Sequence, residues 1–69
     1  MKAATKDLKV IKEAMTLFEA NISKVVYTTN FDKEKESLWL DFGVFYCSGV
    51  VNDMFNAFLL AYTLLKKEK

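Results

Sequence analysis

Few residues of this chain have the types and spacing that catalysis requires. Cys47 is the only cysteine, and the sequence holds no histidine to activate it. Its aromatic neighbours would raise the pKa of the thiol rather than lower it. Asp41 and Asp53 are isolated acids inside apolar segments, where a perturbed pKa can mark a functional pair. A structural role is favoured for both, since Asp53 falls in the first turn of a predicted helix, where an acid stabilises the helix dipole.

Sites for a metal or a phosphate-bearing cofactor are not predicted either. A lone thiolate falls far short of the four ligands of a zinc site. Gly43 and Gly49 are the only glycines and stand apart, so they form no glycine-rich phosphate loop. No nucleophile, base and orienting group can be assembled from the sequence. We therefore expect no enzymatic activity, no metal and no cofactor.

The charges of the chain are nearly balanced. Ten basic residues, all lysine, and nine acids leave a formal net charge of +1, which gives no global field to attract nucleic acid. Arginine, the usual reader of phosphates and guanine edges, is absent. Lys2, Lys6, Lys9 and Lys12 nevertheless follow one side of the first predicted helix, and two such stripes in a dimer would make a broader basic patch. Nucleic-acid binding through these lysines is the alternative function.

The first half of the chain changes from a helical to a strand period. Apolar residues recur at steps of three and four over Lys2–Ala20, which predicts an amphipathic helix capped by Thr5 or Asp7 and stopped by Asn21. Ser23–Phe31 alternates instead and is rich in β-branched and aromatic residues. That pattern is typical of a strand.

The second half is predicted to form a strand and a helix. The charged run Asp32–Glu36 is expected to be a solvated hairpin loop, and Ser37–Cys47 alternates as a second strand. Val50–Leu65 carries one charge, is apolar around most of a helix and follows Ser48, a natural N-cap. The sequence therefore predicts an α+β fold: one α-β-β-α domain over residues 1–69, with an antiparallel β-hairpin and two helices packed on one of its faces.

The predicted fold leaves more apolar surface than one small domain can bury. Hydrophobic residues make up 52% of the 69, while a chain of this size buries only about 60% of its unfolded surface. The predicted protein-interaction or dimer interface consists of Val26, Trp39 and Phe45 on the outer hairpin face and Phe55 and Tyr62 on the second helix. We expect a homodimer, joined through hairpin edges, outer sheet faces or the second helices.

Protein binding is the leading function. We expect a small non-enzymatic protein-binding module, or an accessory regulator or inhibitor, that covers the surface of an unknown partner protein. Small histidine-free, all-lysine chains often have such roles, and phage-encoded proteins that switch off a host enzyme or defence system are one such group. That step is an analogy from size and composition.

A membrane location is not expected. The longest charge-free runs, residues 42–52 and 54–65, hold 11 and 12 residues, short of the roughly 18 that a transmembrane helix needs. The first 21 residues alternate charged and apolar positions, unlike a signal peptide. We therefore expect a cytoplasmic protein.

Overall fold

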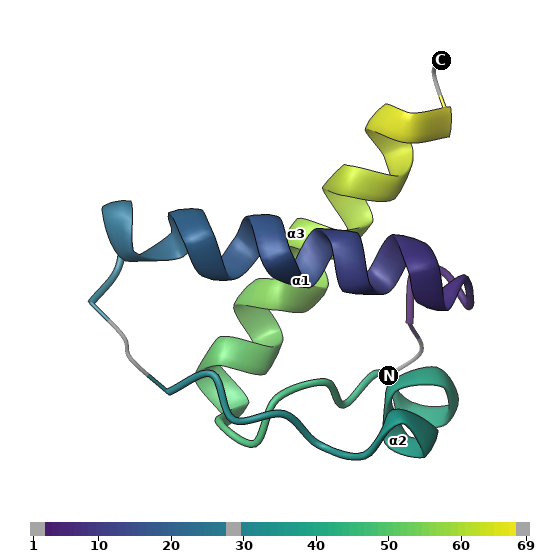
Figure 1. Ribbon diagram of the computed structural model, residues 1–69, viewed down its shortest axis with the longest axis horizontal. Coiled ribbons are helices and arrows are strands. Elements are labelled where there is room, and N and C mark those ends of the chain that lie inside the picture. Colours follow the sequence, from purple (N-terminus) through teal and green to yellow (C-terminus); the bar gives the residue numbers. More distant parts are fainter. Residues whose placement is uncertain (1–2, 28–29, 68–69) are drawn as a thin grey trace.

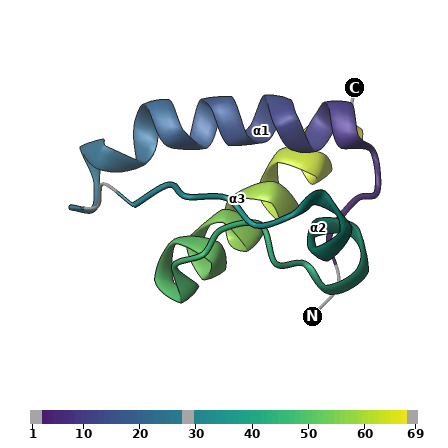
Figure 2. The same cartoon turned by 60° about the horizontal axis from the view of Figure 1, so that its bottom comes forward.

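Residues 3–27 and 30–67 are described by a computed structural model, in which they form three α-helices (Figure 1). They are α1 (Leu8–Asn21), α2 (Glu36–Phe42) and α3 (Gly49–Lys67), and a 3-10 turn, η1 (Ile22–Lys24), extends α1. α1 crosses α3 near the middle of both helices, and the irregular chain around α2 lies on one side of this crossing (Figures 1 and 2). No helix within the described ranges is both long enough and apolar enough to span a membrane.

The first predicted helix is confirmed, but it begins later than Lys2. Asp7 is the N-cap, and its Oδ1 accepts hydrogen bonds from the backbone N–H groups of Lys9 (3.0 Å) and Val10 (3.4 Å). Because this carboxylate satisfies N–H groups that have no partner within the helix, the first turn is fixed at this point. The apolar stripe of α1 then lies in the core: Ile11, Ala14, Met15 and Phe18 are buried.

The predicted β-hairpin, and with it the α+β class, is wrong. Over residues 3–27 and 30–67 the only β-pairing is an isolated antiparallel bridge between Lys33 and Tyr46. The Glu34 N–H donates to the Phe45 carbonyl (3.0 Å), and the Cys47 N–H donates to the Asp32 carbonyl (2.8 Å). The charged run Asp32–Glu36 is therefore part of a short paired segment that leads into α2, rather than a hairpin loop.

The first predicted strand, Ser23–Phe31, lacks the partner that a strand requires. Its described part begins in η1, where the N–H groups of Val25 and Val26 both donate to the Ile22 carbonyl at 3.0 Å; its positions 28 and 29 lie outside the described residues. The alternation does not produce one buried face here, since Val25 is 78% exposed and Tyr27 is fully exposed, while Phe31 packs partly buried against the core. β-propensity reflects packing against neighbouring strands, and no neighbouring strand forms in the described chain.

The second predicted strand, Ser37–Cys47, does not form, and its first part, residues 37–42, belongs to α2. α2 ends at Gly43, whose φ of 67° and ψ of 29° are in the left-handed region that glycine adopts without strain. The Gly43 N–H donates to the Trp39 carbonyl (3.1 Å). An almost continuous apolar run is compatible with either a strand or a buried helix. Here Trp39 is buried, and its indole N–H donates to the Glu34 carbonyl (2.7 Å), which favours the helix.

The second predicted helix is confirmed as α3. The Ser48 Oγ accepts a hydrogen bond from the Val51 N–H (3.4 Å), as expected of its N-cap. Asn52 in the first turns of α3 is buried, and its Oδ1 accepts from the backbone N–H groups of Phe45 (2.7 Å) and Tyr46 (3.2 Å). The Asn52 Nδ2 donates to the Gly43 carbonyl (3.2 Å). One amide therefore fixes the turn after α2 against α3.

Aromatic rings from separate elements meet at Phe55 of α3. Its ring centroid lies 5.3 Å from Phe18, 4.9 Å from Phe45 and 5.3 Å from Tyr46, with interplanar angles of 70–75°. Such edge-to-face contacts stabilise a core beyond the area that they bury. The core of the described chain consists of Ile11, Ala14, Met15, Phe18, Trp39, Phe45, Tyr46, Val51, Phe55 and Leu59.

Candidate functional site

The predicted protein interface is divided between the core and the surface. Trp39, Phe45 and Phe55 are 5% exposed or less, and their rings follow one another at centroid distances of 6.1 and 4.9 Å. The expected outer sheet face does not form, so these three side chains face one another inside the chain. Val26 and Tyr62 are half-buried and lie outside that cluster.

The lysines of the predicted basic stripe are on the surface, although within the described chain only Lys9 and Lys12 belong to α1. Lys6, Lys9 and Lys12 are exposed, while Lys2 lies outside the described residues. The Lys12 Nζ is 3.6 Å from a carboxylate oxygen of Glu36, which reduces the charge available to a phosphate.

The residues considered for catalysis remain separate from one another. Cys47 is exposed, and the pKa of its thiol is raised by desolvation and by the nearby charges of Glu34 and Asp32. A raised pKa disfavours the reactive thiolate. Asp41 and Asp53 are both exposed, and no group of three or more His, Cys, Asp or Glu residues suited to a metal ion occurs in the part of the chain that the structure describes.

An apolar groove lies where the end of α1 and η1 approach the middle of α3. Its volume is about 350 Å³. The lining residues are Phe18, Asn21, Ile22, Lys24, Val25 and Phe58. The ring of Phe18 packs against Phe58 at a centroid distance of 5.8 Å, which joins the α1 and α3 walls. We refer to this feature as the α1–α3 groove.

The polar residues of the α1–α3 groove satisfy one another. The Asn21 Nδ2 donates to the Leu17 carbonyl (2.8 Å), and the Lys24 Nζ donates to the Asn21 Oδ1 (2.9 Å). These bonds hold the amide at the helix end and leave the ammonium of Lys24 as the cationic group at the groove. Apolar walls beside one placed charge are typical of recognition sites.

Phe58, which forms the α3 wall of the groove, is stacked against a tyrosine of the same helix. Tyr62 stacks on Phe58 (centroids 6.1 Å apart, interplanar angle 18°), and its hydroxyl donates to a Glu13 carboxylate oxygen (3.1 Å). The Lys66 Nζ donates to the same oxygen (3.0 Å). Hydrogen bonds from Lys66 and Tyr62 hold the pKa of the Glu13 carboxyl below its usual range. The α3 wall is therefore tied to α1 through the Glu13 carboxylate.

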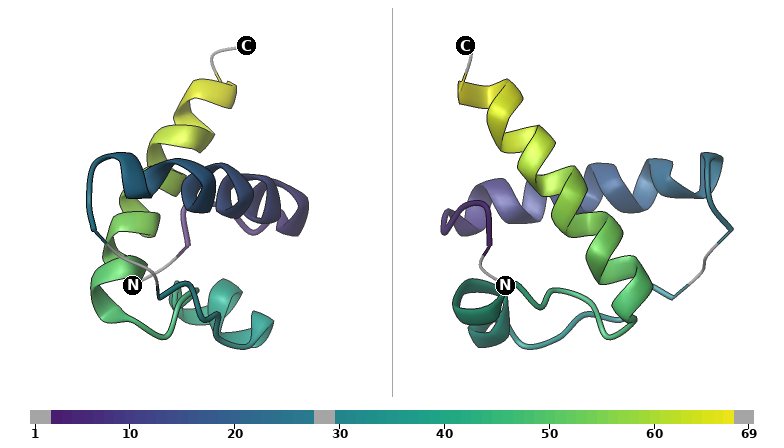
Figure 3. Two further views of the ribbon diagram at one scale, coloured as in Figure 1. Left: turned by 60° about the vertical axis from the view of Figure 1, so that its left-hand side comes forward. Right: turned by 180° about the vertical axis from the view of Figure 1, so that it is seen from behind.

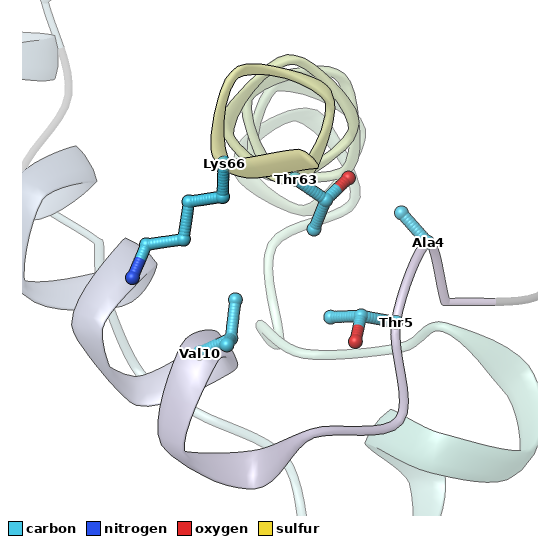
Figure 4. A pocket seen from close by; sticks show the side chains of 5 residues that line it. All are labelled: Ala4, Thr5, Val10, Thr63 and Lys66. Carbon is cyan, nitrogen blue, oxygen red and sulfur yellow. The ribbon is translucent and has the colours of Figure 1, made fainter. Parts of the chain in front are cut away.

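A second hollow lies on the other side of the helix crossing (Figure 4). Ala4, Thr5, Val10, Thr63 and Lys66 line about 300 Å³. Two hydroxyls and an ammonium belong to this lining (Figure 4), and the ammonium is already paired with Glu13. This hollow is thus less suited to an apolar side chain than the α1–α3 groove.

Sequence reasoning did not find the α1–α3 groove. Ile22 continues the apolar spacing of α1 beyond Asn21, which is the available signal, but Lys24 and Val25 fall within the predicted strand Ser23–Phe31. Phe58 falls within the predicted helix Val50–Leu65, for which the sequence indicates no groove. The chain matches no protein family model, and neither the curated proteins nor the solved structures include a match to it.

Proposed function

We propose that this chain is a small non-enzymatic protein-binding module that holds an apolar side chain of its partner in the α1–α3 groove. The supporting observation is the groove itself, whose walls are Phe18, Ile22, Val25 and Phe58. Val25 is 78% exposed, so its apolar surface is available to a partner. An accessory regulator or inhibitor acts through such a surface by covering the partner's own site.

The groove also indicates the chemistry of the partner segment. A large apolar residue in a concave apolar site is the usual anchor of a protein interface. Lys24 lies beside the groove with its Nζ bonded to an amide oxygen rather than to a carboxylate. An acidic residue close to the anchor would therefore complement the site.

The test selects peptides from a displayed random library against the immobilised wild-type protein and measures their affinities for variants. Val25→Asp places a carboxylate on the groove wall without changing the core. Phe42→Asp is the matched control, because Phe42 is 57% exposed on α2 and does not line the groove. We expect selected peptides to share a large apolar residue near an acid, and to bind Val25→Asp at least about tenfold more weakly because the carboxylate is desolvated.

Two outcomes contradict the proposal. Peptides that bind Val25→Asp as tightly as the wild type would place the binding surface elsewhere on the molecule. A selection that enriches no binder for the wild type would remove the groove as a recognition site. Circular dichroism of each variant separates a lost contact from a lost fold.

A further inference from the structure

The α1–α3 groove lies at the C-terminal end of α1. Seen from behind, α3 crosses in front of α1, and the end of α1 projects beyond it (Figure 3). Asn21, the last residue of α1, lines the groove together with Ile22 and Lys24 of η1. The backbone carbonyls at the end of a helix carry partial negative charge, which favours cations and disfavours a carboxylate. Binding of an acidic partner residue at this place therefore depends on a cation that the chain itself supplies.

Lys24 is the cation that the chain places at this helix end. The last turn of α1 holds no basic residue, and Lys24 is the basic residue of η1. Glu19, the acid of that last turn, binds the Lys33 Nζ (2.8 Å) and the Tyr46 hydroxyl (2.8 Å) and does not line the groove. The charge at the groove is thus that of the Lys24 ammonium.

Asn21 holds this ammonium without neutralising it. The Lys24 Nζ donates to the Asn21 Oδ1 (2.9 Å), and the Asn21 Nδ2 donates to the Leu17 carbonyl one turn earlier (2.8 Å). The Nζ atoms of Lys33 and Lys66, in contrast, lie 2.8 and 3.0 Å from carboxylate oxygens. A carboxylate beside Lys24 would cancel most of its charge, whereas the amide fixes its position and leaves the charge available.

We propose that Asn21 is a positioning residue that gives the α1–α3 groove its preference for an acidic partner residue, acting through Lys24. This inference rests on the function proposed for the groove. A partner carboxylate beside the apolar anchor completes the ion pair that the chain leaves open. Asn21→Asp, which exchanges the amide group for a carboxylate of the same shape, closes that pair within the chain and removes the preference.

The test compares two forms of one selected peptide, one with its glutamate and one with glutamine in that position. The wild type is expected to bind the glutamate form about three- to fivefold more tightly, as an exposed ion pair does, and this ratio should approach one at high salt. For Asn21→Asp we expect a ratio of about one or below, because the new carboxylate pairs with Lys24. Lys24→Met removes the ammonium but keeps an apolar stem, so it should also give a ratio of about one.

The matched control is Phe42→Asp. It makes the same change in net charge as Asn21→Asp, on an exposed residue of α2 that does not line the groove. We expect it to leave the ratio of the two affinities at the wild-type value. The ratio separates positioning of Lys24 from a merely structural role of Asn21, since a distorted groove weakens both forms of the peptide alike.

Three outcomes overturn the role of Asn21 while leaving the groove as a binding site. They are selected peptides that share no acidic residue, a wild-type ratio of about one, and a wild-type ratio that persists in Asn21→Asp or Lys24→Met. If neither form of the peptide binds the wild type, the function proposed for the groove is refuted, and this inference is refuted with it.

Discussion

Asn52 is the buried polar side chain of the described core, and it makes hydrogen bonds to three backbone groups. Its Oδ1 accepts hydrogen bonds from the N–H groups of Phe45 and Tyr46, and its Nδ2 donates to the Gly43 carbonyl. Asn56 donates to the same carbonyl from one turn further along α3 (3.0 Å). A buried N–H without an acceptor costs about 1–3 kcal/mol, whereas a typical hydrogen bond contributes about 0.5–1.5 kcal/mol. Asn52, whose loss leaves two such N–H groups, is therefore expected to matter more for stability than Asn56.

Asn52→Ala is predicted to lower the free energy of unfolding by about 2–4 kcal/mol, because it leaves two buried N–H groups without an acceptor. Asn56→Ala is the matched control and is predicted to cost about 1 kcal/mol, since the Gly43 carbonyl keeps its bond from Asn52. Urea denaturation followed by circular dichroism measures both values. Equal losses for the two variants would show that the turn after α2 does not depend on Asn52.

Tyr46 connects that turn to α1. It is 1% exposed, and its hydroxyl donates to a Glu19 carboxylate oxygen (2.8 Å), to which the Lys33 Nζ also binds (2.8 Å). Burial, together with the hydrogen bond and the charge of Glu19, raises the pKa of Tyr46 far above its usual range. The folded chain therefore holds this proton more tightly than the unfolded chain does.

The raised pKa of Tyr46 predicts a loss of stability in alkali. Its contribution is fully present below the unfolded-state pKa of about 10 and is lost above that pH, where only the unfolded chain releases the proton. We predict that above pH 10 the free energy of unfolding of the wild type falls by about 1.4 kcal/mol per pH unit more than that of Tyr46→Phe. Denaturation curves at several alkaline pH values measure the two slopes, and equal slopes would mean that Tyr46 ionises freely in the folded state.

At the scale of elements, the ends of the helices are determined by single residues near them in the sequence. Asp7 caps α1, Ser48 caps α3, and Gly43 ends α2. The two glycines differ in whether their positions would accept a side chain. Gly43 has a positive φ that other residues adopt at a cost, whereas Gly49 begins α3 with open space where a Cβ would lie.

We predict that Gly43→Ala lowers the free energy of unfolding by about 1–2 kcal/mol, because a Cβ disfavours the left-handed conformation. Gly49→Ala is predicted to be neutral or to stabilise by up to about 1 kcal/mol, since alanine loses less backbone freedom in a helix. Thermal unfolding of the two variants side by side checks the difference. A loss for Gly49→Ala as large as that for Gly43→Ala would contradict it.

At the scale of the whole molecule, the apolar excess read from the sequence is only partly absorbed by the core. Trp39 and Phe45, expected on an outer sheet face, are buried in the core. Val25 at the groove and Leu60 and Leu64 on α3 stay exposed, and so do Leu17, Tyr27 and Phe42 on other parts of the chain. The interface proposed at the groove uses part of this remaining surface, which differs from the surface that the sequence predicted.

The sequence by itself determined α1, α3 and the N-cap of α3, and it limited the N-cap of α1 to Thr5 or Asp7. Each helix has a local period that places Ile11 and Phe18, or Val51 and Phe55, on one side, and each cap acts on N–H groups two or three residues away. Such signals are contained within a few turns of chain, so they can be recognised without knowledge of the fold.

Only the tertiary structure decided the middle of the chain and, with it, the candidate site. Residues 37–47 alternate like a strand, yet residues 37–42 belong to α2, because Trp39 is buried in the core and because Asn52, from a later helix, satisfies the turn that follows. Val25 joins Phe58 in a groove only because α1 crosses α3. A strand needs a partner and a groove needs two walls, and both depend on contacts between residues far apart in the sequence.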